Sequence, residues 1–314
     1  MESIQSIKKR VKAVNNIAQI TKAMEMVSAN KMRRSQETAL NSRPYAIAAL
    51  ELLHEIAKRS MHLPILMQKR DTKKILVLLV ASDKGLAGSL NSNVFRYMER
   101  HIGELSTGHR GATMLYAAVG KKAEEFLARK NITPAIAFAG FGDYAMTEET
   151  KPLADFIISG FKTNDWDKVF TISTHFRTTL RQDVLLRELL PLTEGGLKKT
   201  VRELTPEYGK YSSTDGDIKE ISKEHQFEYL IEPTPQVVLD TLTDYLVEMT
   251  VYHLILEANA SEHSARMVAM KNASDNAGDL EDELSLLYNK SRQAGITREI
   301  AEISAGSESL RSNH

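Results

Sequence analysis

The feature that most constrains this chain is a long proline-free stretch near its C-terminal end. After Pro235 no proline follows, and only Gly278 and Gly295 interrupt residues 237–303. Apolar side chains recur there at alternating intervals of four and three residues, which is the spacing of a coiled-coil seam. One continuous helix of roughly 67 residues would be about 100 Å long, several times the usual length in a globular protein.

The seam of this helix includes two histidines, His253 and His263, among apolar residues. The apolar members are Leu242, Leu246, Met249, Leu256, Ala260, Met267 and Met270, followed after Gly278 by Leu280, Leu284, Leu287, Ala294, Ile300 and Ile303. The two histidines are ten residues apart, whereas a helical metal-binding pair needs a spacing of four. We therefore interpret them as seam residues or partner contacts and predict no metal site.

The N-terminal end has a matching pattern. Its apolar stripe is predicted at Ile4, Ile7, Val11 and Val14 and, after a phase slip, at Ile17, Ile20, Met24 and Val27. Helix-favouring residues continue to about Arg59, with Pro44 either opening a second segment or kinking a single helix. Two long helices at opposite ends of a chain bury their stripes most economically against each other. We predict an antiparallel coiled coil formed by residues 1–59 and 233–306.

The middle of the chain, residues 73–231, has a different pattern. Apolar runs of strand length alternate with helical patterns, which indicates a largely parallel sheet covered on both faces. The predicted strands are 75–81, 114–119, 135–141 and 169–175, and the predicted helices are 91–101, 121–130 and 148–161. Residues 179–192 fit either type, 193–226 read as a polar surface insertion, and 227–231 as a short strand. The fold class is thus mixed α+β and α/β, a Rossmann-like central domain joined to a long two-helix coil.

Composition excludes several classes of function. The chain contains no cysteine, so it has no disulfide, thiol nucleophile or thiolate metal site. The first twelve residues lack the apolar core of a signal peptide, and the longest apolar run, residues 75–81, is far too short to cross a bilayer. We find no convincing catalytic constellation, and we expect no cofactor.

The predicted first strand leads into a glycine-containing loop, residues 82–89, and then a helix. Doubly wound folds hold nucleotide phosphates at such a position. The glycines here, Gly85 and Gly88, match neither the dinucleotide fingerprint nor a Walker loop. We interpret the loop as a tight turn, with a nucleotide-dependent enzyme as the alternative.

Charge is balanced overall but unevenly distributed. Residues 1–34 contain eight basic and two acidic side chains, whereas residues 260–303 contain five basic and eight acidic ones. Two solvated helix faces that attract one another explain this, as does a charged shaft that meets oppositely charged partners. A nucleic-acid adaptor is a third alternative, which is disfavoured because no aromatic residues are interleaved with the basic ones.

Several segments are similar to one protein family. Residues 16–32, NIAQITKAMEMVSANKM, resemble the N-terminal helix of the ATP synthase γ family, and residues 82–91 resemble the loop that opens its central domain. The segment LEANASEHSARMVAMKNASDN at residues 256–276, and its continuation to Gly306, resemble the family's C-terminal helix. Two departures are Ser307, where the family normally has alanine, and the longer stretch 193–226.

The resemblance implies a non-catalytic central-stalk rotor, which couples proton flow through a membrane ring of c subunits to ATP synthesis or hydrolysis in β subunits. The implied partners are an alternating hexamer of α and β subunits, the ε subunit and the c-ring. The implied location is the cytoplasmic side of the bacterial inner membrane, peripheral and without a transmembrane segment. The implied contacts with β are made by Met24, Arg266, Gln293, Thr297, Glu299 and Glu302.

Overall fold

The computed structural model describes residues 3–59, 62–109, 111–142, 145–193, 195–196 and 231–311. They fall into two compact units: a lobe unit, residues 28–266, and a terminal unit, residues 3–27 together with 267–311. Most of the predicted insertion at 193–226 and, apart from Ile231, the predicted strand at 227–231 lie outside the described residues.

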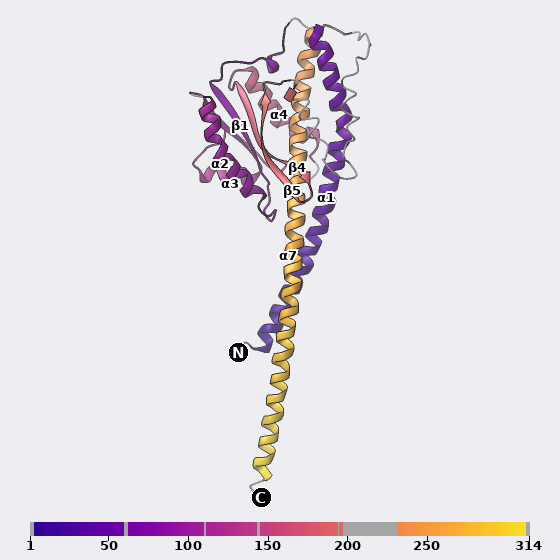
Figure 1. Cartoon of the computed structure of the whole chain (residues 1–314), viewed down its shortest axis with the longest axis vertical. Coiled ribbons are helices and arrows are strands. Elements are labelled where there is room, and N and C mark those ends of the chain that lie inside the picture. The colour runs from indigo at the N-terminus through magenta and orange to yellow at the C-terminus, as the bar shows by residue number, and fades with distance from the viewer. Residues whose placement is uncertain are drawn as a thin grey trace. The chain divides into compact units, whose positions relative to one another are not determined.

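The lobe unit contains a five-stranded sheet (Figure 1). The strand order is β3-β2-β1-β4-β5, and the first four strands run parallel while β5 runs antiparallel to β4. The strands are β1 Lys74–Val80, β2 Thr113–Val119, β3 Ile136–Phe138, β4 Lys168–Thr178 and β5 Arg181–Leu190. The ambiguous residues 179–192 therefore form mainly an edge strand, reached from β4 by a tight hairpin.

Helices cover both faces of this sheet. One face of β1, with Ile75, Val77 and Leu79, packs against α2 Leu90–Gly108 and α3 Lys121–Arg129. The other face packs against α4 Thr147–Lys162 and against the parts of the two long helices that belong to the lobe unit. Since β1 is buried on both sides, it reads in the sequence as an unbroken apolar run.

The two long helices are α1, Ile4–Arg59, and α7, Pro235–Arg311; a short 3₁₀ helix, η1 Ile65–Met67, follows α1. Helix α1 continues through Pro44, so that residue does not open a second segment. Helix α7 spans 77 residues, and neither Gly278 nor Gly295 ends it. No helix among the described residues is both long and apolar enough to span a membrane.

The predicted seam of α1 is wrong in its second half. Ile17 and Ile20 are 52% and 60% exposed. The buried positions instead include Ile7, Thr21, Ser28 and Ser35, which are separated by fourteen, seven and seven residues. The hydroxyls of Thr21 and Ser35 donate to the carbonyl oxygens of Ile17 and Lys31 at 2.9 and 3.1 Å. Small side chains whose polar atoms are satisfied within their own helix can occupy a narrow seam, and an apolar pattern alone does not reveal them.

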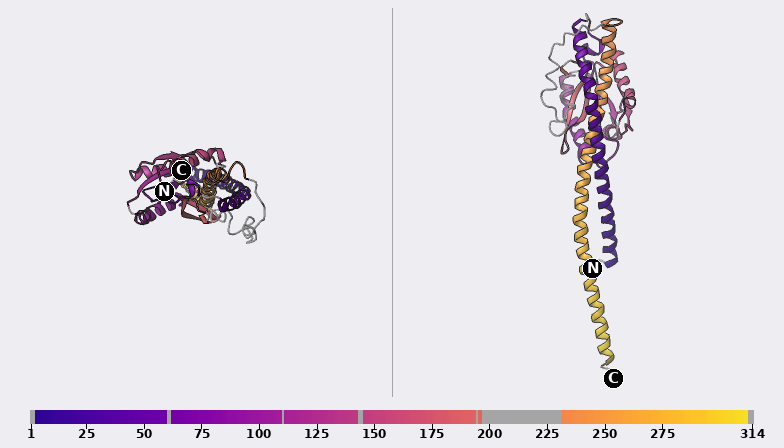
Figure 2. Two further views of the ribbon diagram at one scale, coloured as in Figure 1. Left: turned by 90° about the horizontal axis from the view of Figure 1, so that it is seen from above. Right: turned by 90° about the vertical axis from the view of Figure 1, so that its right-hand side faces the viewer.

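The terminal unit is an antiparallel helix pair. The Asn15 amide donates to Glu281 Oε1 at 2.6 Å, and the Ser274 hydroxyl donates to the Ala18 carbonyl at 3.4 Å. Further along, a Cβ built on Gly295 would lie 3.3 Å from the Ile4 side chain. Partner numbers rise on α7 as they fall on α1, which is the antiparallel order predicted. Beyond Gly295, α7 continues past the N-terminal end of α1 (Figure 2).

Candidate functional site

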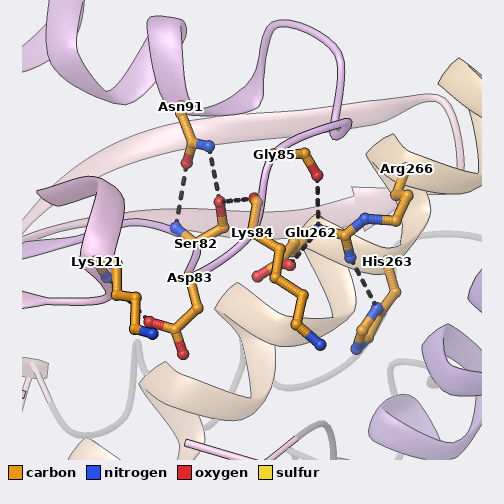
Figure 3. A network of polar contacts seen from close by, with 9 residues as sticks. All are labelled: Ser82, Asp83, Lys84, Gly85, Asn91, Lys121, Glu262, His263 and Arg266. Atoms are coloured by element: carbon orange, nitrogen blue, oxygen red, sulfur yellow. Dashed lines mark hydrogen bonds and ion pairs between the residues drawn. The ribbon is translucent and has the colours of Figure 1, made fainter. Parts of the chain in front are cut away.

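The loop between β1 and α2 is held in shape by its own polar groups. The Ser82 hydroxyl donates to the Lys84 carbonyl at 2.7 Å, and the Ser82 backbone N–H donates to Asn91 Oδ1 at 3.1 Å. The Asn91 amide donates in turn to the Ser82 hydroxyl at 2.7 Å (Figure 3). These bonds fix the loop against the first turn of α2. Within it, Leu86 adopts a positive φ of 65° and is exposed.

Asp83 joins the carboxyl ends of three parallel strands. Its carboxylate accepts from the backbone N–H of Lys121 at 2.9 Å and from that of Gly140 at 2.8 Å. Lys121 begins α3 directly after β2, and Gly140 follows β3. In doubly wound folds that bind nucleotides, backbone N–H groups at such a strand end hold a phosphate. Here a side-chain carboxylate is bound to them, which favours the interpretation of this loop as a structural turn.

Gly120 makes this arrangement possible. Its φ is 89°, and a Cβ at that position would lie 2.0 Å from the carbonyl oxygen of Ala81. The ends of β1 and β2 can therefore approach each other only with glycine at this position.

A cavity of about 240 Å³ lies at the carboxyl ends of β1, β2 and β4. One wall is the β1–α2 loop with Gly120 and Thr174, and the other is α7, with Asn259, Glu262 and His263. Strand order reverses between β1 and β4, and doubly wound folds take their ligands at such a switch point. Helix α7 is bonded across it, because the Asn259 amide donates to the Gly142 carbonyl at 3.1 Å.

Arg266, a predicted β contact, is buried within the lobe unit. Its Nη2 donates to the Gly85 carbonyl at 3.1 Å and pairs with Glu262 one turn earlier on α7. Its Nη1 lies 3.4 Å from Nδ1 of His263, so that nitrogen is the acceptor, since arginine only donates. These bonds connect α7 to the β1–α2 loop (Figure 3).

The other predicted contact residues lie in the terminal unit. Met24 is half-buried on α1, whereas Gln293, Thr297, Glu299 and Glu302 are exposed on α7. Thr297 donates to the Gln293 carbonyl at 2.9 Å, so these two share one face of the helix. The helical period places Glu299 and Glu302 on a different side. The six predicted residues therefore do not form one patch.

A buried charged cluster joins α7 to β4 and β5, and the sequence reasoning missed it. Glu257 Oε2 lies 2.9 Å from Nη1 of Arg187 and 3.2 Å from Nδ1 of His175. Burial alone would raise the pKa of Glu257, but the charge of Arg187 and the hydrogen bonds from both partners outweigh burial and lower it. The sequence does contain one sign of this cluster, because Glu257 is a glutamate inside the otherwise apolar run that follows His253.

His253 lies one helical turn before Glu257. Its ring lies 3.3 Å from the Ser42 hydroxyl of α1. Burial lowers the pKa of His253 to about 4, although the charge of Glu257 opposes this shift. The predicted seam position of His253 is thus confirmed by its burial, and its ring is neutral near pH 7. No group of three or more acidic or histidine side chains among the described residues could hold a metal ion.

Comparison with known proteins identifies the family. A family sequence profile described as ATP synthase matches residues 3–310. The ATP synthase gamma chain of Roseiflexus castenholzii is 37% identical over 313 residues, which cover 99% of each chain. That of Chloroflexus aurantiacus is 37% identical over 316 residues, covering 99% of this chain and 100% of the relative. The chain belongs to the ATP synthase gamma-chain family.

Solved structures agree with this membership. The chain is similar to one in the Tetrahymena thermophila mitochondrial ATP synthase central stalk and c-ring, with a TM-score of 0.53 and 25% identity over 81% of this chain and 99% of the other. A chain of the Euglena gracilis mitochondrial ATP synthase has the same fold, with a TM-score of 0.62 and 19% identity over 99% and 95%. The predicted fold class is confirmed. As a gamma chain, the protein is a non-catalytic subunit of an enzyme complex.

Proposed function

We propose that this gamma chain is the central-stalk rotor of an F-type ATP synthase. It couples proton flow through a membrane-embedded c-ring to ATP synthesis and hydrolysis in catalytic β subunits. The observation that carries this proposal is the far end of α7. Gly295 packs against Ile4, the first residue of α1. Beyond it on α7, Ile296, Ile300 and Ile303 are 50%, 59% and 72% exposed.

Exposed isoleucines on a bare helix mark a surface that another protein covers. An alternating ring of three α and three β subunits around this helix supplies such a cover. The ring is threefold, whereas a single helix pair has no threefold symmetry, so each β subunit meets a different face of the shaft. At a given rotor angle, the shaft favours one β conformation because its contacts with that conformation are more favourable than its contacts with the others.

The remaining partners and the location follow from the same role. Of the proposed coil, residues 1–59 and 233–306, the upper part lies within the hexamer, while the lower part and the central domain, residues 73–231, lie toward the membrane. The central domain with the lower coil binds the ε subunit and the c-ring. The chain is then peripheral at the cytoplasmic side of the bacterial inner membrane.

The contacts with β remain proposals for individual residues. Met24, Gln293, Thr297, Glu299 and Glu302 are at least partly accessible in the terminal unit, as a contact surface requires. Arg266 differs, because its guanidinium is bonded to Gly85 and Glu262 within the lobe unit. For Arg266 we propose a supporting role, in which it holds α7 near the β contact.

Affinity capture of the tagged full chain from its host tests the function. Recovery of three α and three β subunits per copy, together with ε and c, supports the rotor. Capture of nucleic acid that is lost steeply with added salt would favour the adaptor alternative instead. Stoichiometric binding of a nucleotide to the purified chain, measured by calorimetry, would favour the enzyme alternative.

A further inference from the structure

Within the lobe unit, α7 packs on the sheet mainly through apolar side chains. Leu246, Val247, Val251, Leu254 and Ile255 are all buried in the same cluster as one face of β1. Hydrophobic contact resists separation, but it is not directional and discriminates weakly between neighbouring registers. A helix that carries torque needs, in addition, bonds that resist sliding and rotation.

Glu257 supplies such bonds from two strands at once. In the β4–β5 register Arg187 stands opposite Thr171, and Thr171 is four residues before His175. Arg187 and His175 therefore project from the same face of the sheet. The carboxylate of Glu257 accepts from Arg187 and also from Nδ1 of His175, which carries the proton because an ionised carboxylate can only accept. Charge-assisted hydrogen bonds of this kind depend strongly on geometry.

A second directional contact lies on the same face of α7. Ser264 follows Glu257 by seven residues, so the two side chains point in nearly the same direction. The Ser264 hydroxyl donates to the Thr179 carbonyl at 2.6 Å and accepts from the Gln182 amide at 3.3 Å. Thr179 and Gln182 belong to the β4–β5 hairpin. The helix is therefore held to this hairpin at two points two turns apart.

Buried ion pairs are poor stabilisers, since apolar side chains of the same volume often stabilise a fold equally well. The side chains of Glu257 and Arg187 are only 10% and 15% exposed, so this pair has given up most of its hydration. A role in fixing geometry accounts for its presence better than a role in stability does.

We propose that Glu257, with His175 and Arg187, is a positioning lock that fixes the register of α7 on β4 and β5 and transmits torque between lobe and helix. This Glu257 lock rests on the rotor function proposed above. The three side chains bond to one another across helix and sheet, so they act by positioning the helix rather than by chemistry.

The test uses the complete ATP synthase in inverted membrane vesicles, with ATP hydrolysis and ATP-driven proton uptake measured on the same preparation. Glu257→Gln keeps the shape of the side chain and removes its charge. We expect hydrolysis to persist while proton uptake per ATP hydrolysed falls severalfold. Glu248→Gln is the matched control on the same helix, because its 3.9 Å pair with Lys151 is partly exposed, and it should leave the ratio unchanged.

The double variant Arg187→Gln with Glu257→Gln separates positioning from stability. Removing both charges leaves none buried without a partner, so thermal stability should recover toward that of the parent. The lock predicts that proton uptake per ATP stays low in spite of this recovery. The double variant also carries the test if Glu257→Gln does not assemble.

Two results would overturn the lock: an unchanged uptake ratio in Glu257→Gln, or an uptake ratio in the double variant that recovers together with stability. Failure of the proposed function gives a different result. In that case the unmodified chain itself would neither assemble with α and β subunits nor support proton uptake.

Discussion

The two units of this chain solve the problem of burial in opposite ways. The lobe unit buries both faces of its sheet and supplements apolar packing with internal polar bonds, such as those of Asp83 and Glu257. The terminal unit buries a few seam residues, among them Ile7 and Leu284, and leaves many large apolar side chains exposed. The difference indicates that the described part of the lobe unit buries its own core, whereas the terminal unit is shaped for a surrounding partner.

The strongest challenge to this comparison is a matched pair of truncations, Phe161→Ala and Ile300→Ala. Phe161 is fully buried, so its truncation should lower the free energy of unfolding of the purified chain by about 3–5 kcal/mol. Ile300 is 59% exposed, so its truncation should stay within about 0.5 kcal/mol. Denaturant titration followed by circular dichroism measures both. Equal losses would show that the terminal unit is as self-contained as the lobe.

Acid should act on the lobe unit through His253. The pKa of His253 is about 4 in the folded chain and ordinarily 6.5. Between these pH values the unfolded chain therefore binds a proton that the folded chain does not. Stability should therefore fall as the pH decreases from 6.5 toward 4, by up to about 3 kcal/mol. The fall in the pKa of Glu257 adds a loss only below that residue's ordinary value of 4.5. Between pH 4.5 and 6.5 the loss from His253 is therefore not mixed with the loss from Glu257.

Unfolding titrations across that window measure the slope. His253→Gln, which cannot titrate there, should flatten it, with His101→Gln as the control on α2, well away from the His253 and Glu257 cluster. A slope that persists in His253→Gln would assign the acid sensitivity to another group.

Replacing glycine by alanine should change the stability in opposite directions at one position in each unit. A Cβ at Gly160 in α4 would lie 2.0 Å from the Trp166 ring, so Gly160→Ala should destabilise the chain by about 1–3 kcal/mol. A Cβ added at Gly278 in α7 would meet no atom within 4 Å other than the adjoining backbone of its own helix, so Gly278→Ala should stabilise the helix by about 0.5–1 kcal/mol. Melting temperatures of the two variants decide this. A stabilising Gly160→Ala would mean that Trp166 yields easily and that the lobe is loosely packed.

The smallest effect on stability is expected for Met24→Lys, because Met24 is only half-buried and the long lysine stem can reach water. Its effect should appear in function, with coupling impaired more than assembly. Proton-driven ATP synthesis in reconstituted vesicles, normalised to the amount of assembled complex, is the measurement. Normal synthesis in this variant would remove Met24 from the proposed β contact.

Much of the architecture could be predicted from the spacing of apolar residues and from the positions of proline. The absence of proline after Pro235 predicted α7, and the unbroken apolar run at residues 75–81 predicted the buried central strand β1. The register of the coil could not be read in the same way. Ser28 and Ser35 occupy buried seam positions because their size suits a narrow gap, while Ile17 and Ile20 point outward. Hydrophobicity alone would place the isoleucines in the seam and the serines outside it, which is the reverse of their positions in the structure.

The polar bonds of the lobe unit were also beyond the reach of the sequence. Glu257, His175 and Arg187 are separated by up to 82 residues and meet only because β4 and β5 pair in one register. The predicted role of Arg266 rested on family resemblance and did not include its bond to Gly85. Local patterns specify elements, whereas such contacts depend on how the elements are placed together.

The carboxylate of Asp83 has a thermodynamic consequence for a protein that works among nucleotides. Folds that require a bound phosphate gain stability in proportion to the logarithm of its concentration, so their rigidity follows the metabolic state of the cell. In this lobe the group that accepts from the backbone N–H groups of Lys121 and Gly140 is a side chain of the protein itself, so its presence does not depend on the concentration of a ligand. The turn at the end of β1 therefore needs no bound nucleotide to satisfy these N–H groups, whatever the levels of ATP and ADP around it.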